Sequence, residues 1–209
     1  MDVPTYPADP EVAARLVGFI QDAAHLAGCE ILHVTDPRRT PLQFSIDGPL
    51  IGRIGVVCYA SPMTACYRPR RVGRTLEFTI ASAPTDSAHP GFWKDPFALF
   101  TTIVVGIDFI GGLFVGADPQ TQDPLRLPRR IVVPPSMARR LLSRGWHSWE
   151  RTEGETEAFG FCETIVGATQ AWFSEYVRFE SLATGLDPGH RQLLSERLFV
   201  RAAKQDSLR

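Results

Sequence analysis

The residues from Thr101 to Asp118 constrain the fold more than any other part of the chain. Apolar side chains alternate along both halves of this stretch, which are separated by Phe109-Ile110-Gly111-Gly112. A period of two is typical of strands, and glycine supplies the positive φ that a tight turn needs. The stretch therefore predicts a β-hairpin whose two apolar strands lie at the centre of the core.

A helix is predicted before the first strand. Asp9-Pro10 is typical of an N-cap followed by proline at the first helical position. Apolar residues then recur at three- and four-residue spacing from Val12 to Ala24. We expect this amphipathic helix to end at Gly28, whose lack of a side chain suits a helix terminus.

From Glu30 the apolar period changes to two, and Asp-Pro, Gly-Pro and Ser-Pro pairs separate short stretches rich in β-forming residues. This pattern favours a mostly antiparallel sheet. Besides the hairpin, the predicted strands are Glu30 to Val34, Leu42 to Ile46, Ile54 to Tyr59, Thr75 to Ala81, Arg129 to Val133 and Phe161 to Val166.

Helical patterns return late in the chain. Ser136 to Arg144 predicts a short basic helix closed by Gly145. Two further helices follow, one from about Thr169 to Thr184 with Gly185 as its C-cap, and one from Asp187-Pro188 onward. The resulting prediction is one α+β domain over residues 1–209, with a mostly antiparallel sheet and a central β-hairpin. Its regions are an N-terminal helix (1–28), a mainly β part (30–166) and two C-terminal helices (168–205).

Several classes of protein are disfavoured by composition. The longest apolar run, Phe97 to Val105, is far shorter than the roughly 20 residues of a membrane span. Met1 to Pro10 is acidic and proline-rich rather than basic and then apolar, so we expect no secretory signal and a cytoplasmic location. Four cysteines without a C-x-x-C pair argue against a disulfide framework and predict reduced, mostly buried thiols.

Common catalytic motifs are absent. The sequence has no phosphate-binding glycine loop, no G-x-S-x-G and no H-E-x-x-H, so we assign no catalytic residue, metal ligand or cofactor. Glu77, Asp108 and Asp118 could supply carboxylates for Mg²⁺ in a nuclease, or could be ordinary strand-end acids. Cys29 and His33 have a spacing that suits two zinc ligands, but no second pair follows them.

Positive charge is concentrated in the middle of the chain. The net charge is −1, yet residues 37–149 carry +7 and are flanked by segments of −5 and −3. Only two of the 22 basic residues are lysine, and the planar fork of arginine binds phosphate in two places. A local positive field attracts polyanions, unless the acidic ends of the chain fold back and neutralise it.

The basic residues form two clusters, and the second precedes a pair of tryptophans. Arginines near exposed aromatic rings can hold a phosphate backbone while stacking a base. Alternatively, the tryptophans anchor the core and the arginines form a solvated rim. The candidate nucleic-acid-binding residues are Arg68, Arg70, Arg71, Arg74, Arg129, Arg130, Arg139, Arg140, Trp146 and Trp149.

A resemblance to a known group rests on three stretches: Thr101 to Pro119, Gly145-Trp-His-Ser-Trp-Glu-Arg151, and Tyr176-Val-Arg-Phe-Glu180. Together they resemble poorly characterised modules that accompany restriction-type endonucleases and other bacterial defence proteins. The resemblance covers about residues 40–195 and implies a module that sits beside a nuclease rather than cutting. Where related sequences carry a Glu-Phe-Lys-like strand, this chain reads Glu77-Phe78-Thr79.

These observations lead to one leading hypothesis and two alternatives. The first is a non-catalytic nucleic-acid-associated module of a bacterial restriction or antiviral defence system, which binds the phosphate backbone of DNA through an arginine-rich surface. The second is a protein-interaction subunit that docks on an acidic partner, since tryptophan and arginine are frequent binding hot spots. The third is a Mg²⁺-dependent nuclease.

Overall fold

The computed structural model describes residues 3, 5–66, 75–80, 92–93, 95, 99–121, 129–152 and 162–206. The helices are α1 (Pro10–Leu26), α2 (Pro135–Arg144), α3 (Phe173–Ala183), which a short 3₁₀ helix η2 (Gln170–Trp172) precedes, and α4 (Pro188–Asp206). The strands are β1 (Tyr6–Pro7), β2 (Glu30–Val34), β3 (Arg39–Thr40), β4 (Leu42–Gly48), β5 (Gly52–Pro62), β6 (Thr64–Cys66), β7 (Thr75–Ile80), β8 (Phe100–Asp108), β9 (Leu113–Ala117), β10 (Arg129–Val133), β11 (Trp146–Thr152) and β12 (Cys162–Thr169).

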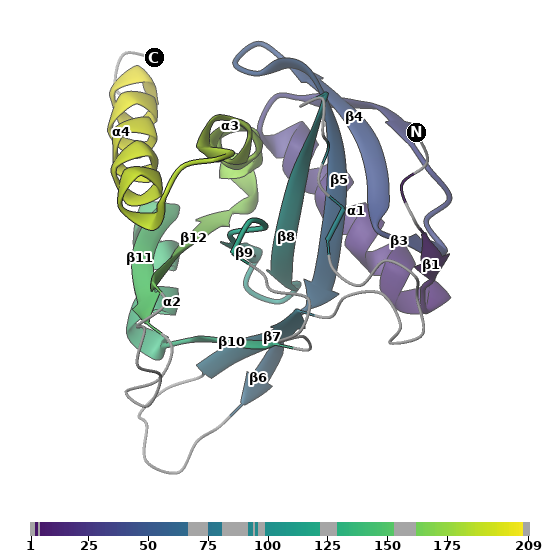
Figure 1. The fold of residues 1–209 in the computed structure, drawn as a ribbon, viewed down its shortest axis with the longest axis horizontal. Coiled ribbons are helices and arrows are strands. Elements are labelled where there is room, and N and C mark those ends of the chain that lie inside the picture. Colours follow the sequence, from purple (N-terminus) through teal and green to yellow (C-terminus); the bar gives the residue numbers. More distant parts are fainter. Residues whose placement is uncertain are drawn as a thin grey trace.

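A seven-stranded sheet with the order β11-β12-β9-β8-β5-β4-β2 forms the body of the molecule (Figure 1). Its strands pair antiparallel except for β5 and β8, which run parallel. A smaller sheet, β10-β7-β6, crosses one end of the large sheet in this view. The predicted α+β class with a mostly antiparallel sheet is therefore confirmed.

The β8–β9 hairpin lies at the centre of the large sheet, as the sequence predicted. Asp108 pairs with Leu113 at the turn, and Val104 pairs with Ala117 at the far end. Gly112 has a φ of 62°, which is the left-handed conformation that the turn requires. The Asp108 carboxylate accepts a hydrogen bond of 3.2 Å from the backbone N–H of Ile110 and holds the turn closed.

The two faces of the large sheet are covered by different elements. Ile103, Val105 and Ile107 of β8 belong to the core under the helices, together with side chains of α1 and α3. Val104 points to the opposite face and packs with residues of β7, β10 and α2. The period of two read from the sequence thus corresponds to two separate cores, one on each side of the central hairpin.

Two glycines in the hairpin allow large rings to approach its backbone. A Cβ at Gly116 would lie 1.9 Å from the Tyr176 hydroxyl oxygen on the helical face. A Cβ at Gly106 would lie 2.3 Å from the Phe78 ring on the other face. Each face of the hairpin therefore packs an aromatic side chain directly against main chain, which only glycine permits.

The helix ends follow the capping pattern of the sequence. The Asp9 side chain accepts hydrogen bonds from the backbone N–H groups of Glu11 and Val12, both at 3.0 Å. Gly145 and Gly185 end their helices with φ values of 76° and 82°. None of the helices, as far as the chain is described, is long and apolar enough to cross a membrane.

The fold has four helices: the predicted N-terminal and two C-terminal ones, and α2 between β10 and β11, where Ser136 to Arg144 predicted a short helix. The strands β1, β3, β6 and β11 are additions to the predicted list. The residues from Trp146 to Thr152, for which no element was predicted, form strand β11. β11 pairs with β12 along its whole length and is one edge of the large sheet.

Candidate functional site

The candidate arginines fall into three groups in the structure. Arg68, Arg70, Arg71 and Arg74 lie outside the described residues, as does the side chain of Arg129. Arg130 forms an ion pair with Glu77 across the β10–β7 pair, and 52% of its side chain is exposed against 13% for Glu77. Arg139 and Arg140 lie exposed on α2. Of the described candidates, those on α2 are therefore the most open to a ligand.

Helix α2 buries one side and exposes its basic residues. Ala138 and Leu141 pack into the core beneath the small sheet, whereas Arg139, Arg140 and Arg144 are exposed. The helix has no acidic residue, and in the described part of the chain no ion pair engages these three arginines. Arg140 and Arg144 lie one turn apart, so their side chains share one side of the helix.

Strand β11 sends its side chains alternately to its two faces. Trp146 is 3% exposed, and its indole N–H donates a 3.1 Å hydrogen bond to the Ser195 hydroxyl on α4. The prediction that Trp146 binds nucleic acid is therefore wrong, because a buried ring cannot stack on a base. Its role is the core anchor that the sequence left as the alternative.

Trp149 lies on the face of β11 that adjoins α2. Its ring is half-buried and stacks on the His147 ring, with centroids 5.9 Å apart and an interplanar angle of 27°. Burial lowers the pKa of His147, and the nearby guanidinium groups of Arg140 and Arg144 lower it further. The contribution of the two guanidinium groups to this shift indicates a positive local potential. We call Arg139, Arg140, Arg144, His147 and Trp149 the α2–β11 surface.

The three carboxylates considered for a metal site are not brought together. Asp108 lies at the turn of the β8–β9 hairpin, whereas Asp118 follows the opposite end of β9. Glu77 lies in the small sheet and is paired with Arg130. Among the described residues, no group of three or more His, Cys, Asp and Glu side chains could hold a metal ion. The arrangement that the nuclease alternative requires is therefore absent from this part of the chain.

The cysteines that the structure describes fully are free thiols. Cys29 and Cys58 are buried, and burial raises the pKa of both. His33, four residues after Cys29, is exposed on β2. The side chains of Cys66 and Cys162 lie outside the described part of the chain. Where the side chains are described, the expectation of buried, reduced cysteines is met.

A buried charge network, which the sequence analysis missed, joins the sheet to α3 and α4. Arg191, in the first turn of α4, is 1% exposed. Its Nε lies 3.2 Å from Asp118 Oδ2, and its Nη2 donates to both oxygens of Glu180 at 3.1 and 2.9 Å. Its Nη1 donates a longer hydrogen bond of 3.4 Å to the carbonyl of Ala183. One guanidinium therefore holds the end of β9 and two helices together.

The environment of this network shifts two acid–base groups. Burial raises the pKa of Glu180 to about 7, and the negative charge of Asp118 contributes in the same direction against the opposing effect of Arg191. Burial also raises the pKa of Tyr176 well above its ordinary value. Ionisable groups with strongly shifted pKa values mark functional sites more often than chance, although structural ion pairs shift them as well.

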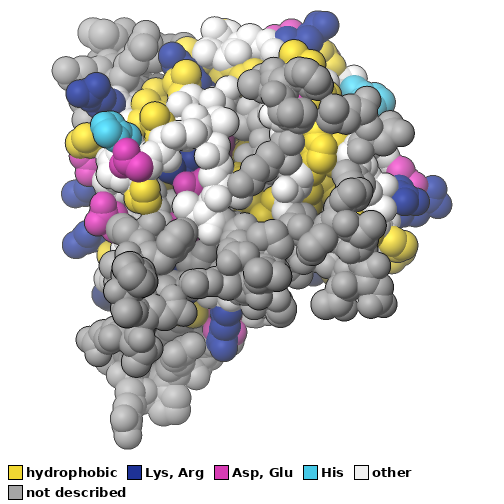
Figure 2. Space-filling view, viewed as in Figure 1, with side chains coloured by type: hydrophobic (Ala, Val, Ile, Leu, Met, Phe, Trp, Pro, Cys, Tyr) yellow, Lys and Arg dark blue, Asp and Glu magenta, His cyan; other side chains and the backbone are white. Residues whose placement is uncertain are grey.

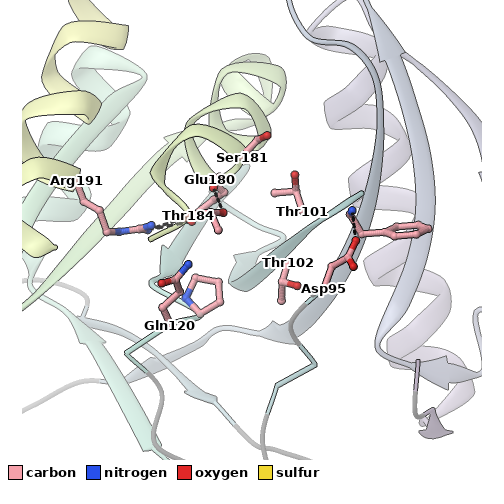
Figure 3. A pocket seen from close by; sticks show the side chains of 10 residues that line it. Asp95, Thr101, Thr102, Gln120, Glu180, Ser181, Thr184 and Arg191 are labelled. Atoms are coloured by element: carbon pink, nitrogen blue, oxygen red, sulfur yellow. Dashed lines mark hydrogen bonds and ion pairs between the residues drawn. The ribbon is translucent and has the colours of Figure 1, made fainter. Parts of the chain in front are cut away.

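A cavity of about 100 Å³ adjoins the network (Figure 3). Its walls come from the start of β8, the residues after β9, the C-terminal half of α3 and the first turn of α4. Arg191 reaches from α4 toward Glu180, with Gln120 below them in the view and Thr101 across from them. The polar and charged residues of the lining are Asp95, Thr101, Thr102, Gln120, Glu180, Ser181, Thr184 and Arg191.

The outer side of α4 carries charges of both signs in its described part. Over the part of α4 whose side chains are described, as far as Leu198, Figure 2 shows basic and acidic side chains interspersed. The signal in the sequence that could have led to the network is slight, because an arginine after a helix start is usually solvated.

Comparison of the chain with protein-family models, curated proteins and solved structures finds no match.

Proposed function

We propose that this chain is a non-catalytic module that binds nucleic acid through the α2–β11 surface. The observation that carries the proposal is the set of three exposed guanidinium groups on α2, none of them in an ion pair with a described residue. Arginines that are free of carboxylate partners keep their donors available for phosphate oxygens.

The electrostatics of the surface support this role. The charges of Arg140 and Arg144 lower the pKa of His147, so the field that an approaching phosphate meets is positive. The lowered pKa of His147 favours its neutral form, so the attraction rests on the arginines. Interactions of this kind act on the nucleic-acid backbone and carry no sequence preference.

The stacked rings of His147 and Trp149 add an aromatic element beside the arginines. Unpaired bases can stack on such rings, whereas bases inside a duplex cannot reach them. The surface therefore fits single-stranded nucleic acid at least as well as duplex. The proposed setting is a bacterial restriction or defence system, in which this chain lies beside a separate nuclease. The setting is inferred from the resemblance of residues 101–119, 145–151 and 176–180.

The test is a fluorescence-anisotropy titration of single-stranded and duplex DNA over a series of salt concentrations. The parent should bind both at low salt, and the logarithm of its affinity should fall linearly with the logarithm of salt concentration. The triple variant Arg139→Gln, Arg140→Gln, Arg144→Gln should show a shallower plot of log affinity for duplex DNA against log salt concentration. The magnitude of the slope should fall by about 0.9 for each phosphate that the protein no longer neutralises.

The matched control is the triple variant Arg38→Gln, Arg53→Gln, Arg197→Gln, which removes the same charge from exposed positions elsewhere. It should leave the slope nearly unchanged. If the slope changes equally in both triple variants, the effect comes from the net charge of the protein and not from the α2–β11 surface. Absence of binding by the folded parent at low salt contradicts the proposal and leaves an acidic protein partner as the alternative ligand of this surface.

A further inference from the structure

Another cavity lies between the first half of α1 and the sheet strands β4 and β5. Its volume is about 210 Å³. Residues in and next to β1 and β3, which pair with each other beside the start of α1, form a further wall (Figure 1). An apolar cavity of about 150 Å³ in another protein is large enough to bind benzene. The space between α1 and the sheet is therefore large enough for a small organic molecule.

The wall that α1 provides is apolar. Val12, Ala13, Leu16 and Val17 lie at helical spacing on one side of this helix, and all four line the cavity. Leu16 and Val17 pack against the main core, yet both are only half-buried. The apolar surface that the core leaves uncovered on this side of α1 is available to a ligand.

The wall that the sheet provides is apolar as well. Leu42 of β4 and Cys58 of β5 are cross-strand neighbours, and with Ala60 they lie on the sheet face that α1 covers. Burial raises the pKa of the Cys58 thiol, so the sulfur is uncharged and is not a nucleophile. Tyr59, between Cys58 and Ala60, directs its ring to the other face of the sheet, where it packs on Phe92.

Small side chains on two walls explain why the space exists. Ala13 on the helix and Ala60 on the strand each carry only a methyl group, and both line the cavity. A larger side chain at either position would occupy the space that a ligand needs.

The two charged residues of the lining are exposed and engaged elsewhere. The Asp9 carboxylate accepts the backbone N–H groups of Glu11 and Val12 and caps α1. The Arg39 guanidinium donates to the hydroxyl and the carbonyl oxygen of Thr5, at 2.7 and 3.1 Å. A charge held against the apolar walls would have no partner there, and burying an unpaired charge is costly. The cavity therefore favours a neutral molecule.

One polar side chain of the lining has unused hydrogen-bonding capacity. Thr40 lies on the side of the β1–β3 pair opposite to Arg39, because successive residues of a strand alternate. It shares this side with Ala8, which also lines the cavity. In the described part of the chain the Thr40 hydroxyl makes no hydrogen bond. It is therefore able to donate to a ligand or to accept from one.

We propose that this cavity binds a small neutral molecule with an apolar body, a single ring in size, and one hydroxyl group that bonds to Thr40. By volume the cavity holds about seven or eight non-hydrogen atoms. The apolar body contacts α1, β4 and β5. The site shares no residue with the α2–β11 surface and does not rest on nucleic-acid binding.

The experiment is a titration of the full chain with p-cresol at pH 7 and constant ionic strength, followed by amide chemical shifts in two-dimensional NMR. We expect saturable shifts at Ala13, Leu16 and Ala60, with a Kd of about 1 mM, which is ordinary for a ligand of this size. The amide of Ala138 on α2 should not respond. The anion 4-methylbenzoate carries the same ring and methyl group with a charge and should bind at least tenfold more weakly.

A pair of variants on α1 tests the place of binding. Ala13→Leu extends a side chain into the cavity and should lower the affinity for p-cresol at least tenfold. Ala14→Leu makes the same change at the next position, which is exposed, and should leave the affinity unchanged.

The role of the hydroxyl is tested with Thr40→Val and a second ligand. Toluene has the ring and methyl group of p-cresol but cannot form the hydrogen bond. Thr40→Val should therefore weaken p-cresol about fivefold, the equivalent of one hydrogen bond, and leave the affinity for toluene unchanged. A general loosening of the site would weaken both ligands alike.

The proposal is overturned if p-cresol gives no saturable shifts at these three amides in the folded parent, or if 4-methylbenzoate binds as tightly. It is equally overturned if Ala13→Leu binds p-cresol as well as Ala14→Leu does, or if Thr40→Val weakens p-cresol and toluene alike. Should Ala13→Leu fail to fold, Ala60→Leu fills the same space from the sheet and takes its place. None of these outcomes depends on whether the chain binds DNA.

Discussion

Arg191 on α4 is 1% exposed and bound by two carboxylates, whereas Arg139, Arg140 and Arg144 on α2 are exposed and in no ion pair with described residues. Both regions contain arginine next to aromatic side chains: Arg191 lies 5.0 Å from the Phe179 ring, and α2 adjoins the His147–Trp149 stack. The difference shows that surroundings decide the role. Arg191 shares its burial with two carboxylates and holds elements together, whereas the arginines of α2, which no described carboxylate pairs with, stay exposed.

The sharpest way to break this comparison is to remove Arg191. Arg191→Met leaves Asp118 and Glu180 buried without their cation, so the free energy of unfolding should fall by about 3 to 5 kcal/mol. Arg197→Met, at an exposed position on the same helix, should change it by no more than about 0.5 kcal/mol. Urea denaturation followed by circular dichroism measures both, and equal effects would contradict a structural role for Arg191.

The second test uses pH. The pKa of Glu180 in the folded protein is raised to about 7 from an ordinary value of 4.5, so the native state holds this proton more tightly than the unfolded chain. The stabilising contribution of the protonated form is complete below about pH 4.5 and is lost as the pH rises through 7, by up to about 3 kcal/mol.

The difference in free energy of unfolding between the parent and Glu180→Gln isolates this contribution, because glutamine does not titrate. Urea titrations at several pH values between about 4.5 and 8 should show the parent losing stability relative to the variant as the pH rises. A flat difference would mean that Arg191 offsets the effect of burial and that Glu180 stays ionised throughout.

A third test examines how tightly Tyr176, whose helix carries Glu180 of the buried network, packs against the backbone of β9. Gly116→Ala places a Cβ against the Tyr176 hydroxyl and should lower the free energy of unfolding by about 1 to 3 kcal/mol. Gly18→Ala in α1, where an added Cβ meets no atom within 4 Å, should raise it by about 0.5 to 1 kcal/mol. Thermal denaturation followed by circular dichroism shows the two signs directly.

The smallest effect on stability is expected at the α2–β11 surface. Replacing Arg139, Arg140 and Arg144 by glutamine together should change the free energy of unfolding by less than about 0.5 kcal/mol for each position. Under the proposed function, the same variant should lose most of the affinity for DNA. A large drop in stability would show instead that these side chains cover apolar surface of the fold.

Much of the framework could be predicted from local pattern. The β8–β9 hairpin, the start of α1 at Asp9-Pro10 and the helix ends at Gly145 and Gly185 all follow from periodicity and capping chemistry. These features depend on residues that are close together in the sequence, so they can be predicted from the sequence alone. Strand β11 was not predicted, because the face that carries His147 and Trp149 is aromatic rather than polar. The sequence of this strand therefore lacks the alternation of apolar and polar residues that indicates a strand.

The candidate site was less accessible to sequence reasoning. The partners of Arg191 come from Asp118 and Glu180, which lie on other elements and are related only by tertiary packing. Trp146 and Trp149 are three residues apart, yet one is buried under α4 and the other faces α2. An odd separation along a strand places side chains on opposite faces, and the strand has to be recognised before this rule applies.

The parallel pairing of β5 with β8 has a consequence for how the chain reaches its native state. These neighbouring strands are separated by the whole excursion from Met63 to Leu99, part of which pairs with β10 on the other side of the molecule. Pairings between residues so distant along the chain must overcome a large entropy of loop closure before they stabilise anything. The pairing of β9 with β12 joins residues still farther apart, so refolding should be slow for a chain of this length.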